Sequence, residues 1–399
     1  MNKPWVIHVG AGPWQVSAIR RVRELGYRTL AVDGDPKAVG FEFADDFIVA
    51  NIGSIEDVKI AVRAYFAAIS EAPLAVVCTA CEVGMLSAAN LRQHFDLPGT
   101  RLDLARKLTN KGEQRRSWMG LASPRFTVLR GPVTQIEPAL SELRTEKIII
   151  KPIDSSGSRG ITVVPRKNVR REHLDWALQH SGSNELIVEE FIHGREYTIE
   201  SVRLNGKSYP ILLTSKEKVS GTEATVANLL KSCRVEDDQA KAIHALVQHA
   251  QDALGYDNGV CHTEVIEDTH GFFWLVETAG RGAGFGVSEH FIKYATGYDY
   301  FEASLRFDLG LPVEEPPSGM PDMISAVRFL ESTPGILVEV VNESDTTVYP
   351  LLEPGTVMSA PKTDGDRVAY FYIKGDTPEA VDQKIIEVLG MIRIGVNEE

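Results

Sequence analysis

Residues 262–282, HTEVIEDTHGFFWLVETAGRG, are mostly apolar, yet glutamates interrupt the run at positions 264 and 277. The flanking segments Val260–Ile266 and Phe272–Thr278 are rich in β-branched and aromatic residues, which favour strands. Between them Asp268-Thr269-His270-Gly271 is a strong turn sequence. The stretch is therefore predicted to be a β-hairpin that carries two carboxylates.

The register of this hairpin decides where the carboxylates point. If Asp268 and Gly271 are the first and last turn residues, Glu264 lies opposite Leu275 and His262 lies opposite Glu277. Side chains of a strand alternate between its two faces, so these four residues are expected on one face. The two carboxylates then become diagonal neighbours, roughly 5–8 Å apart at Cβ.

Two carboxylates that converge on a covered sheet face repel each other and are costly to bury. A structural explanation is pairing with Arg281 or with a lysine. The alternative is a hard divalent cation, because Mg²⁺ is commonly bound by one or two carboxylates together with nucleotide phosphates. This metal interpretation requires a nucleotide site elsewhere in the chain.

Composition and charge narrow the class of protein. The chain of 399 residues is long enough for two or three domains. Its content of 43% hydrophobic and 24% charged residues is ordinary for a globular protein. The formal net charge of −13 argues against nucleic acid or an anionic membrane as the main partner. Four cysteines predict a reduced, cytoplasmic protein, and the N-terminus is not expected to be a signal peptide. Cys78-Thr79-Ala80-Cys81 has CxxC spacing, but small buried residues at a strand end are the favoured interpretation.

The first part of the chain alternates strands and helices, which predicts a parallel sheet with helices on both faces. The expected strands and helices are Trp5–Val9, Gln15–Leu25, Thr29–Val32, Glu56–Ile69, Leu74–Cys78 and Gly84–His94. The turn GAGP (10–13) with Asp33 partly matches a dinucleotide fingerprint, but Gln15 occupies the third glycine position. Its backbone N–H groups would suit a carboxylate or phosphate.

The rest of the chain contains a second alternating region and a smaller α+β part. Helices are expected at Arg101–Gly120, Arg171–His180, Gln239–Leu254, from about Ser288 and at Pro378–Leu389. Strands are expected at Lys147–Lys151, Ile161–Val164, Leu186–Phe191, Tyr197–Leu204, Ser325–Leu330, Ile336–Val341 and Arg367–Ile373. The proline-rich segment Leu311–Pro321 is predicted to be a linker.

A second motif supplies the nucleotide site that the carboxylates require. In IIIKPIDSSGSRGITVV (148–164), Lys151 ends an apolar strand and a loop of small and polar residues follows. Such a loop can fold over phosphates, because its backbone N–H groups and hydroxyls carry little bulk and the lysine adds a fixed positive charge. It is not a Walker A motif, and a flexible hairpin loop is the structural alternative.

Taken together these motifs resemble the ATP-grasp superfamily. A strand-end lysine, a Ser/Gly loop, IVEEFIHGREYTIE and a glutamate hairpin that ends E-x-x-x-R occur in the characteristic order. The segments VGAGPWQ, AVDGDP and FADDFIVANIGSIEDV resemble the pre-ATP-grasp domain of carbamoyl-phosphate-synthetase-like enzymes, and HTE, ETAGRGAG and TGYDYFEASL are similar to the L-amino-acid ligase branch. The resemblance implies an ATP-grasp fold of α/β and α+β type. It implies a Rossmann-like domain at 1–105, an ATP-grasp domain at 106–310 with a lid subdomain at about 123–190, and a C-terminal α+β lobe at 311–399.

The resemblance also implies roles for particular residues. The nucleotide-contacting positions are Lys111, Lys151, the lid residues Ser155, Ser156, Gly157, Ser158 and Gly160, the adenine hinge Glu189, Glu190, Phe191 and Ile192, and the ribose acceptor Glu196. Glu264 and Glu277 match the Mg²⁺ ligands, with Mn²⁺ as an alternative ion, and Arg281 matches the arginine that contacts the transferring phosphoryl group or the acyl-phosphate. Lys216 or Lys218 would contact the γ-phosphate or substrate, and His262 would orient a carboxylate. Two departures are Asn110 in place of an acidic residue and Ala279 in place of a further asparagine ligand.

The implied activity is an ATP-dependent carboxylate–amine ligase that acts through an acyl-phosphate and releases ADP and phosphate. The substrates would be an amino acid or similar small acid and an amine, in a homodimer. A purine-biosynthesis or biotin-carboxylase-like enzyme, which activates formate or bicarbonate, is the alternative within the superfamily. A dinucleotide-dependent oxidoreductase would leave the hairpin glutamates and the Ser/Gly loop without a role, and a non-catalytic nucleotide-binding module would leave the metal carboxylates without one.

Overall fold

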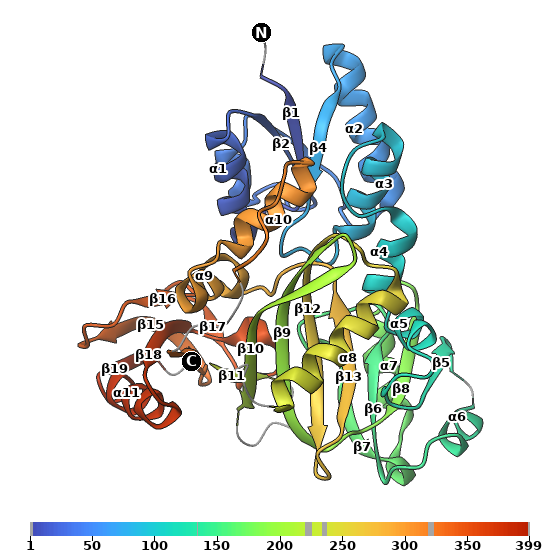
Figure 1. The fold of residues 1–399 in the computed structure, drawn as a ribbon, viewed down its shortest axis with the longest axis vertical. Coiled ribbons are helices and arrows are strands. Elements are labelled where there is room, and N and C mark those ends of the chain that lie inside the picture. The colour runs from blue at the N-terminus through green and yellow to red at the C-terminus, as the bar shows by residue number, and fades with distance from the viewer. Residues whose placement is uncertain (1–2, 134, 220–225, 234–237, 318–322, 398–399) are drawn as a thin grey trace.

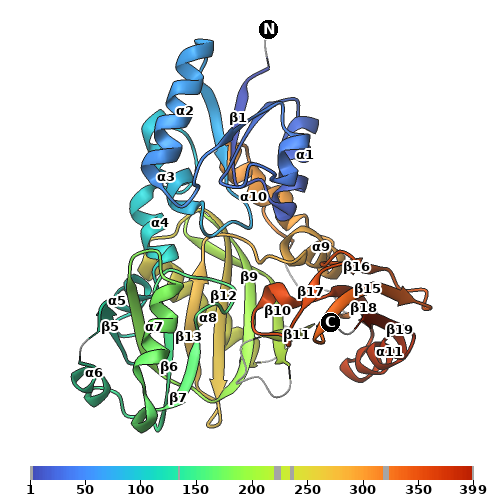
Figure 2. The ribbon, with the colours of Figure 1, turned by 180° about the vertical axis from the view of Figure 1, so that it is seen from behind.

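The computed structural model describes residues 3–133, 135–219, 226–233, 238–317 and 323–397. An N-terminal α/β part lies at one end, a large twisted sheet with a smaller sheet beside it lies at the other, and a C-terminal lobe projects to one side (Figures 1 and 2). Within the described part of the chain, every helix is too short or too polar to span a bilayer.

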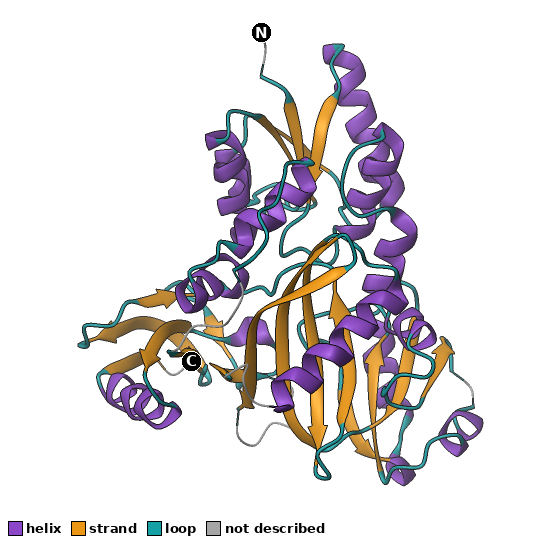
Figure 3. Ribbon diagram, viewed as in Figure 1, coloured by secondary structure: helices purple, strands orange, loops and turns teal. Residues whose placement is uncertain are grey.

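The N-terminal part contains the predicted parallel sheet with helices on both faces (Figure 3). Its strands, in the order β3-β2-β1-β4, are β1 (Trp5–Val9), β2 (Arg28–Asp33), β3 (Asp46–Val49) and β4 (Pro73–Val77). Apolar side chains of α2 (Ile55–Ile69) and α3 (Met85–Phe95) pack on one face. The other face is covered by α1 (Val16–Glu24) and by a helix from much later in the chain, α10 (Tyr300–Leu309). Short 3₁₀ turns lie at Pro13–Gln15 and Val39–Phe43.

The single helix predicted for Arg101–Gly120 is wrong, because two helices occupy this segment. α4 (Leu102–Thr109) ends at Asn110, which has an extended backbone with φ −124° and ψ 111°. The Asn110 side chain accepts a hydrogen bond from the backbone N–H of Glu113 at 2.9 Å and so starts α5 (Lys111–Ser117). The break places Lys111 at the first residue of a new helix.

A separate four-stranded antiparallel sheet follows, in the order β5-β8-β6-β7. Its elements are β5 (Phe126–Arg130), α6 (Glu137–Ser141), β6 (Lys147–Pro152), β7 (Thr162–Pro165), the 3₁₀ turn Arg166–Asn168, α7 (Arg171–Gln179) and β8 (Glu185–Glu190). Apolar side chains of α7 and of the sheet share one core, which includes Leu174, Ile150 and Val188. The predicted Ser/Gly loop connects β6 with β7.

The central element is an eight-stranded antiparallel sheet in the order β13-β12-β9-β10-β11-β14-β18-β16. Its strands are β9 (Gly194–Leu204), β10 (Lys207–Lys218), β11 (Ala227–Ser232), β12 (Gly259–Asp268), β13 (Phe273–Ala279), β14 (Ile324–Leu330), β16 (Val348–Pro350) and β18 (Ala369–Gly375). α8 (Asp238–Leu254) packs on one face, and a π-helical turn (Val287–Phe291) and α9 (Ile292–Thr296) lead into α10.

The C-terminal lobe adds a three-stranded sheet in the order β17-β15-β19. Its elements are β15 (Gly335–Asn342), β17 (Val357–Met358), the 3₁₀ turn Asp364–Asp366, α11 (Pro378–Gly390) and β19 (Ile392–Asn397). Since β14, β16 and β18 join the central sheet, that sheet crosses the domain boundary predicted at residue 310, and the three-domain division stays a prediction. Part of the predicted linker, residues 318–321, lies outside the described residues.

Candidate functional site

The predicted hairpin exists as β12 and β13, but its register differs from the predicted one. The turn is closed by a hydrogen bond from Gly271 N–H to the Asp268 carbonyl at 3.0 Å. Glu264 lies directly opposite Glu277, and His262 lies opposite Ala279, so the predicted pairings with Leu275 and Glu277 are wrong.

Two shifts of one residue each cause the difference. Next to the turn, Val265 pairs with Leu275 instead of the predicted Trp274, and a β-bulge adds the second shift. The register shifts between Glu264 and Val265, where one extra residue of β13 is inserted. The alternation of β13 therefore reverses at this point, and Leu275 pairs with Val265 in the apolar core under α8. The prediction that Leu275 shares the glutamate face is wrong, whereas the two carboxylates do share one face and become direct neighbours.

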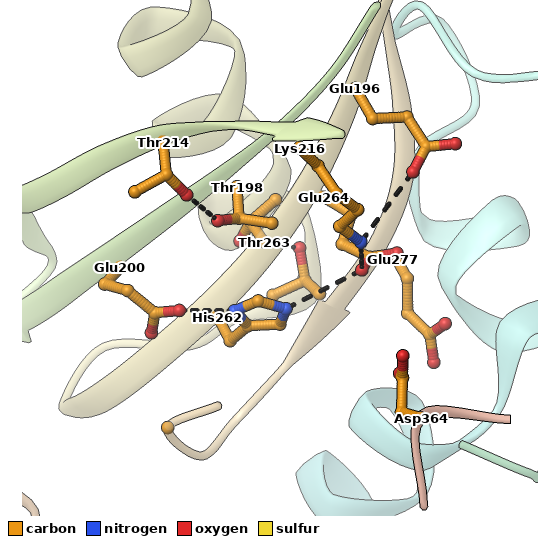
Figure 4. A network of polar contacts seen from close by, with 12 residues as sticks. Glu196, Thr198, Glu200, Thr214, Lys216, His262, Thr263, Glu264, Glu277 and Asp364 are labelled. Atoms are coloured by element: carbon orange, nitrogen blue, oxygen red, sulfur yellow. Dashed lines mark hydrogen bonds and ion pairs between the residues drawn. The ribbon is translucent and has the colours of Figure 1, made fainter. Parts of the chain in front are cut away.

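The register of the neighbouring strands extends this polar face (Figure 4). Glu264 lies opposite Thr198 of β9, and Thr198 lies opposite Thr214 of β10. Two residues along each strand, His262 lies opposite Glu200. The intervening β9 residues Tyr197 and Ile199 point into the core on the other face. The E-x-T-x-E alternation of residues 196–200 was the available sequence signal for Glu200.

Glu264, Glu277, His262 and Thr198 face a cavity of about 550 Å³. Nearly every predicted site residue lines it: Lys111, Lys151, Ser155, Ser156, Gly157, Ser158, Glu189, Glu190, Phe191, Ile192, Glu196, Lys216, Lys218, His262, Glu264, Glu277 and Arg281. Gly160 does not line the cavity, and neither do residues 10–13 of the glycine turn. Trp14, which follows that turn, does line it. Four further lining residues that the sequence reasoning missed are Glu82, Arg115, Asp364 and Arg367.

Glu264 is held between two cationic side chains. Lys216 Nζ lies 2.5 Å from Glu264 Oε1, and His262 Nε2 lies 3.8 Å from the same oxygen. Burial would raise the pKa of Glu264, but the charge of Lys216 and the bond to His262 outweigh it and lower that pKa well below its usual range. Burial likewise opposes the charge of Lys216, yet Glu264 and Glu196 raise the pKa of this lysine.

His262 has a second carboxylate partner. Its Nδ1 lies 2.5 Å from Glu200 Oε1, and Tyr300 donates its hydroxyl to Glu200 Oε2 at 3.1 Å. Burial lowers the pKa of His262, but the charge of Glu200 and its hydrogen bond raise that pKa to about 9. The imidazole is therefore fixed as a cation between Glu200 and Glu264 at neutral pH.

Glu277 is paired with the lysine that begins α5. Lys111 Nζ lies 3.1 Å from Glu277 Oε1 and donates to the backbone carbonyl of Ser155 at 2.5 Å. One ammonium thus connects the hairpin carboxylate with the Ser/Gly loop. That loop contains three left-handed residues, Gly157, Ser158 and Gly160, and a Cβ at Gly160 would meet Pro152 and His180 at 2.7 and 2.8 Å.

Lys151 is paired with the fully buried Glu189. Its Nζ lies 2.8 Å from Glu189 Oε2, and Arg115 Nε lies 2.6 Å from Glu189 Oε1. Burial would raise the pKa of Glu189, but Arg115 and Lys151 outweigh it, so that pKa is lowered. Arg115 lies four residues after Lys111 on one helix face, a spacing that could have revealed it.

The predicted adenine hinge is a strand end with several backbone groups already bonded. The N–H of Glu190 donates to the Arg125 carbonyl at 3.0 Å, and that of Phe191 donates to the Lys147 carbonyl at 3.2 Å. The Glu190 carboxylate accepts from the backbone N–H of Arg144 at 2.7 Å. Glu196, the predicted ribose acceptor, is ion-paired with Lys218. The nucleotide roles of these residues stay predictions.

Arg281 is paired with a residue from the N-terminal part. Its Nε donates to Glu82 Oε2 at 2.5 Å, and its Nη1 donates to the Gly282 carbonyl at 3.0 Å. Burial lowers the pKa of this guanidinium, but Glu82 and Glu277 raise it more, so the pKa is raised. The anticipated structural pairing of Arg281 with a hairpin glutamate is thus replaced by an ion pair with Glu82.

The glycine turn at residues 10–13 is used internally. Asp33 Oδ2 accepts the Ala11 N–H at 2.7 Å, and the Gly10 N–H donates to the Val32 carbonyl at 2.8 Å. Gln15, which occupies the third glycine position, donates Nε2 to the carbonyls of Thr79 and Ala80 at 3.0 and 3.2 Å. The N–H groups of Gly10 and Ala11 are therefore used within the protein, and Gln15 holds the neighbouring loop at Thr79 and Ala80.

The donor set of the hairpin fits a hard divalent ion only when a ligand contributes. Among the described residues, no group of three His, Cys, Asp or Glu side chains is arranged to hold a metal. Glu264 and Glu277 face each other across β12 and β13 on the cavity side. Two carboxylates with phosphate oxygens are a common Mg²⁺ environment, so the pair fits an ion that arrives with a nucleotide.

Comparison with known proteins identifies one part of the chain. Residues 145–289 match the family model described as an ATP-grasp domain, so this part of the chain is an ATP-grasp domain. The fold agrees over its whole length with an L-amino acid ligase from Bacillus licheniformis, at a TM-score of 0.82 with 17% identity, 100% of this chain and 99% of that chain covered. Phosphoribosylglycinamide synthetase from Anaerococcus prevotii aligns at a TM-score of 0.75 with 18% identity, 99% and 100% covered.

Two relatives by sequence are ligases by name. D-alanine–D-alanine ligase of Pseudomonas fluorescens is 29% identical over 164 residues, which are 40% of this chain and 48% of that protein. Alanine–anticapsin ligase of Bacillus subtilis is 23% identical over 251 residues, 56% of this chain and 51% of the relative. The chain spans about half the length of the curated relatives it matches.

Proposed function

We propose that the protein is an ATP-dependent carboxylate–amine ligase. The observation that carries this proposal is the single cavity in which Glu264 and Glu277 lie side by side, flanked by Lys111 and Lys216, with Arg281 at the end of β13. Phosphoryl transfer to a carboxylate requires three kinds of group. They are a pair of carboxylates that binds a metal ion, cations that bind phosphates, and an arginine that binds the substrate carboxylate or the acyl-phosphate.

In this proposal the reaction has two steps. The γ-phosphoryl group of ATP passes to the acid and gives an acyl-phosphate and ADP, and an amine then attacks the carbonyl carbon and releases phosphate. Glu264 and Glu277 would hold Mg²⁺, which neutralises phosphate charge when bound. Lys111 and Lys151 would bind phosphate oxygens, and Lys216 or Lys218 would assist on the γ-phosphate or substrate. The Ser155–Gly160 loop would cover the site, because water would hydrolyse the acyl-phosphate.

The substrate class is proposed from two supports. The relatives matched by sequence carry names that describe ligation of alanine or D-alanine, and a structural neighbour is named an L-amino acid ligase. Activation of bicarbonate or formate is less favoured, although biotin carboxylase and N5-carboxyaminoimidazole ribonucleotide synthetase share the fold. We therefore propose an amino acid or similar small acid as the acyl donor. A homodimer and a cytoplasmic location stay predictions, which light scattering and fractionation would test.

The test is ADP release with ATP, Mg²⁺ and pairs of amino acids, with mass spectrometry of the product. Wild-type protein should release ADP only with a suitable pair and should form a dipeptide or amide of matching mass. Glu277→Gln is the control for the site, and reduction of a nicotinamide dinucleotide is the control for the oxidoreductase alternative. ADP release with bicarbonate or formate but with no amino-acid pair would refute the proposal.

A further inference from the structure

We propose that Cys78 and Cys81 form a reversible disulfide, and that formation of this disulfide inactivates the candidate site. The first part concerns a modification site and stands on the geometry of the two cysteines, whereas the second part rests on the proposed ligase function. Both residues follow β4 in the N-terminal part, with Thr79 and Ala80 between them. The sequence favoured small buried residues for this CxxC segment, but both cysteines are partly exposed.

The two thiols lie close together. The Cys78 thiol donates to the backbone carbonyl of Cys81 at 3.4 Å. A Cβ at Gly84 would meet Cys81 Sγ at 3.1 Å and Cys78 Sγ at 3.4 Å, so both sulfurs border the same point. A disulfide requires side chains that already face each other over a short distance. The pair meets this requirement without a rearrangement of β4 or α3.

The two thiols differ in reactivity. A hydrogen bond from Cys78 lowers the pKa of Cys81, and the backbone N–H of Gly84 and the charge of Arg281 add to this effect against the opposing effect of burial. The hydrogen bond between the thiols and burial raise the pKa of Cys78 well above its usual range. Because the thiolate is the attacking form of cysteine, Cys81 should react first with an oxidant and Cys78 should complete the disulfide.

Cys81 lies where a small oxidant can reach it. Ala80 and Glu82, its neighbours in the chain, both line the cavity. The next residue, Val83, is 54% exposed. The other two cysteines belong to different elements, since Cys233 follows β11 and Cys261 is fully buried in β12.

The oxidant that we propose is a low-molecular-weight disulfide such as oxidised glutathione. The Cys81 thiolate attacks one of its sulfurs, which forms a mixed disulfide and releases one glutathione thiolate. Cys78 then attacks Cys81 Sγ and releases the second glutathione, which takes the proton of Cys78. In total, two protein thiols are oxidised to one disulfide, and one small disulfide is reduced to two thiols.

Formation of the bond must shift the segment that carries Glu82. A disulfide bond is about 2.05 Å long, whereas atoms in contact without a bond are roughly 3.5–4.0 Å apart, so the sulfurs must approach by about 1–2 Å. Gln15 holds one side of the turn, because it donates to the carbonyls of Thr79 and Ala80 at 3.0 and 3.2 Å. The movement should therefore pass to Cys81 and to the adjacent Glu82.

Glu82 connects this movement with the candidate site. Its Oε2 accepts from Arg281 Nε at 2.5 Å, and the two side chains are only 9% and 16% exposed. Arg281 is the residue proposed to bind the substrate carboxylate or the acyl-phosphate. A displacement of about 1 Å in such a group can lower the rate about 100-fold. The oxidised protein should therefore be a poor ligase.

The first experiment is a redox titration of the whole chain with mixtures of oxidised and reduced glutathione. Remaining thiols are alkylated after denaturation, and the peptides are analysed by mass spectrometry. In the wild type, the peptide with Cys78 and Cys81 should lose two hydrogen atoms, and dithiothreitol should restore them. Wild type that stays reduced at these positions, or that keeps glutathione on Cys81 without further reaction, would overturn the disulfide.

Single variants test the order of the two steps. Cys78→Ser should stop at the mixed disulfide between Cys81 and glutathione, whereas Cys81→Ser should leave Cys78 reduced. Cys233→Ser is the matched control, because it removes a partly exposed thiol elsewhere, and it should form the disulfide as the wild type does. Equal reaction of Cys78→Ser and Cys81→Ser with glutathione would overturn the assignment of Cys81 as the attacking thiol.

The second experiment measures ADP release before and after oxidation. Oxidation of the wild type should lower the rate by about 10- to 100-fold, and dithiothreitol should restore it. Cys81→Ser should keep its rate under both conditions. Unchanged ADP release from fully oxidised wild type would overturn the inactivation.

A structural measurement separates this proposal from the proposed function. If the reduced wild type releases no ADP with any pair of substrates, the ligase function fails, but the mass spectrometry still tests the disulfide. Amide hydrogen exchange then tests the movement of the turn. Oxidation should speed exchange at Gly84, because its N–H loses the charged sulfur of Cys81 as its acceptor. Equal exchange at residues 79–84 in the oxidised and reduced protein would overturn the movement.

Discussion

Replacing Glu189 by glutamine tests whether the buried charges beneath the candidate site depend on one another. Glu189 is 0% exposed and lies between Arg115 Nε at 2.6 Å and Lys151 Nζ at 2.8 Å. Glutamine keeps the shape of the side chain but removes its charge. Two cations, both almost fully buried, then remain without their shared counterion.

The expected loss of stability is large. Removal of one partner from a buried ion pair costs about 3–5 kcal/mol, because the remaining charge stays out of water. Glutamine retains one oxygen that can accept from either cation, which favours the lower end of this range. We therefore expect a loss of about 3 kcal/mol in the sheet that contains β6 and β8.

Amide hydrogen exchange of β6 and β8 measures this loss locally. A loss of about 3 kcal/mol corresponds to exchange that is roughly 100-fold faster. Glu185→Gln is the matched control on the same strand, because Glu185 lies 4.0 Å from an Arg130 side chain that is 76% exposed, and an exposed pair contributes less than about 1 kcal/mol. If the two variants exchanged at similar rates, the reasoning about the buried charges would be refuted.

The same variant has an expected pH dependence. The pKa of Glu189 is lowered in the folded protein, so its charge stabilises the fold above its unfolded pKa of about 4.3. This contribution is lost as the pH falls below that value toward the folded pKa. The difference between wild type and Glu189→Gln should therefore be full at pH 7 and should shrink in acid.

Four further predictions concern the hairpin, the loop, the arginine and a buried histidine. Glu277→Gln should lower ADP production about 10²–10³-fold with the fold intact, and near wild-type activity at saturating Mg²⁺ would contradict the metal role. Residues Ser155–Gly160 should gain amide protection when an ATP analogue and Mg²⁺ bind, and equal protection in both states would argue against a lid. Arg281→Lys should weaken acid-dependent ADP release more than ATP binding, whereas loss of nucleotide affinity or thermal stability alone would indicate a structural role. Burial lowers the pKa of His8 to about 3. As the pH falls from 7.5 to 5, the free energy of unfolding of the wild type should therefore decrease by about 2 kcal/mol, and that of His8→Leu should not. Parallel curves of unfolding free energy against pH for the two proteins would contradict this.

The sequence alone predicted the features that depend on local apolar periodicity and on the order of motifs along the chain. Alternating strands and helices predicted the N-terminal parallel sheet, and the turn at Asp268–Gly271 predicted the glutamate hairpin. The order of motifs along the chain predicted the ATP-grasp fold. Short edge elements were missed, for example β3, whose four residues are mostly exposed and form no long apolar run.

Other features depend on contacts that no local pattern contains. A bulge adds one residue without changing the apolar composition of a strand, so the pairing of Glu264 with Glu277 could not be predicted. The helix break at Asn110 was missed because the apolar periodicity continues on both sides of it, although asparagine is a common N-cap. Glu82 and Arg281 are 199 positions apart, and only the fold brings the two side chains together.

The pattern of ion pairs explains how so many charges can share one cavity without a bound ligand. Lys111 neutralises Glu277, Lys216 neutralises Glu264, and Lys151 neutralises Glu189. Three carboxylates without these lysines would be costly to bury, and the same is true of the lysines alone. In the proposed function, the first two ion pairs exchange their partners for ligands of the same charge. A divalent cation would bind the two carboxylates in place of the lysines, and phosphates would bind the two lysines in place of the carboxylates. Metal and nucleotide should therefore bind as a unit, because either one alone leaves half of the exchanged charges without a partner.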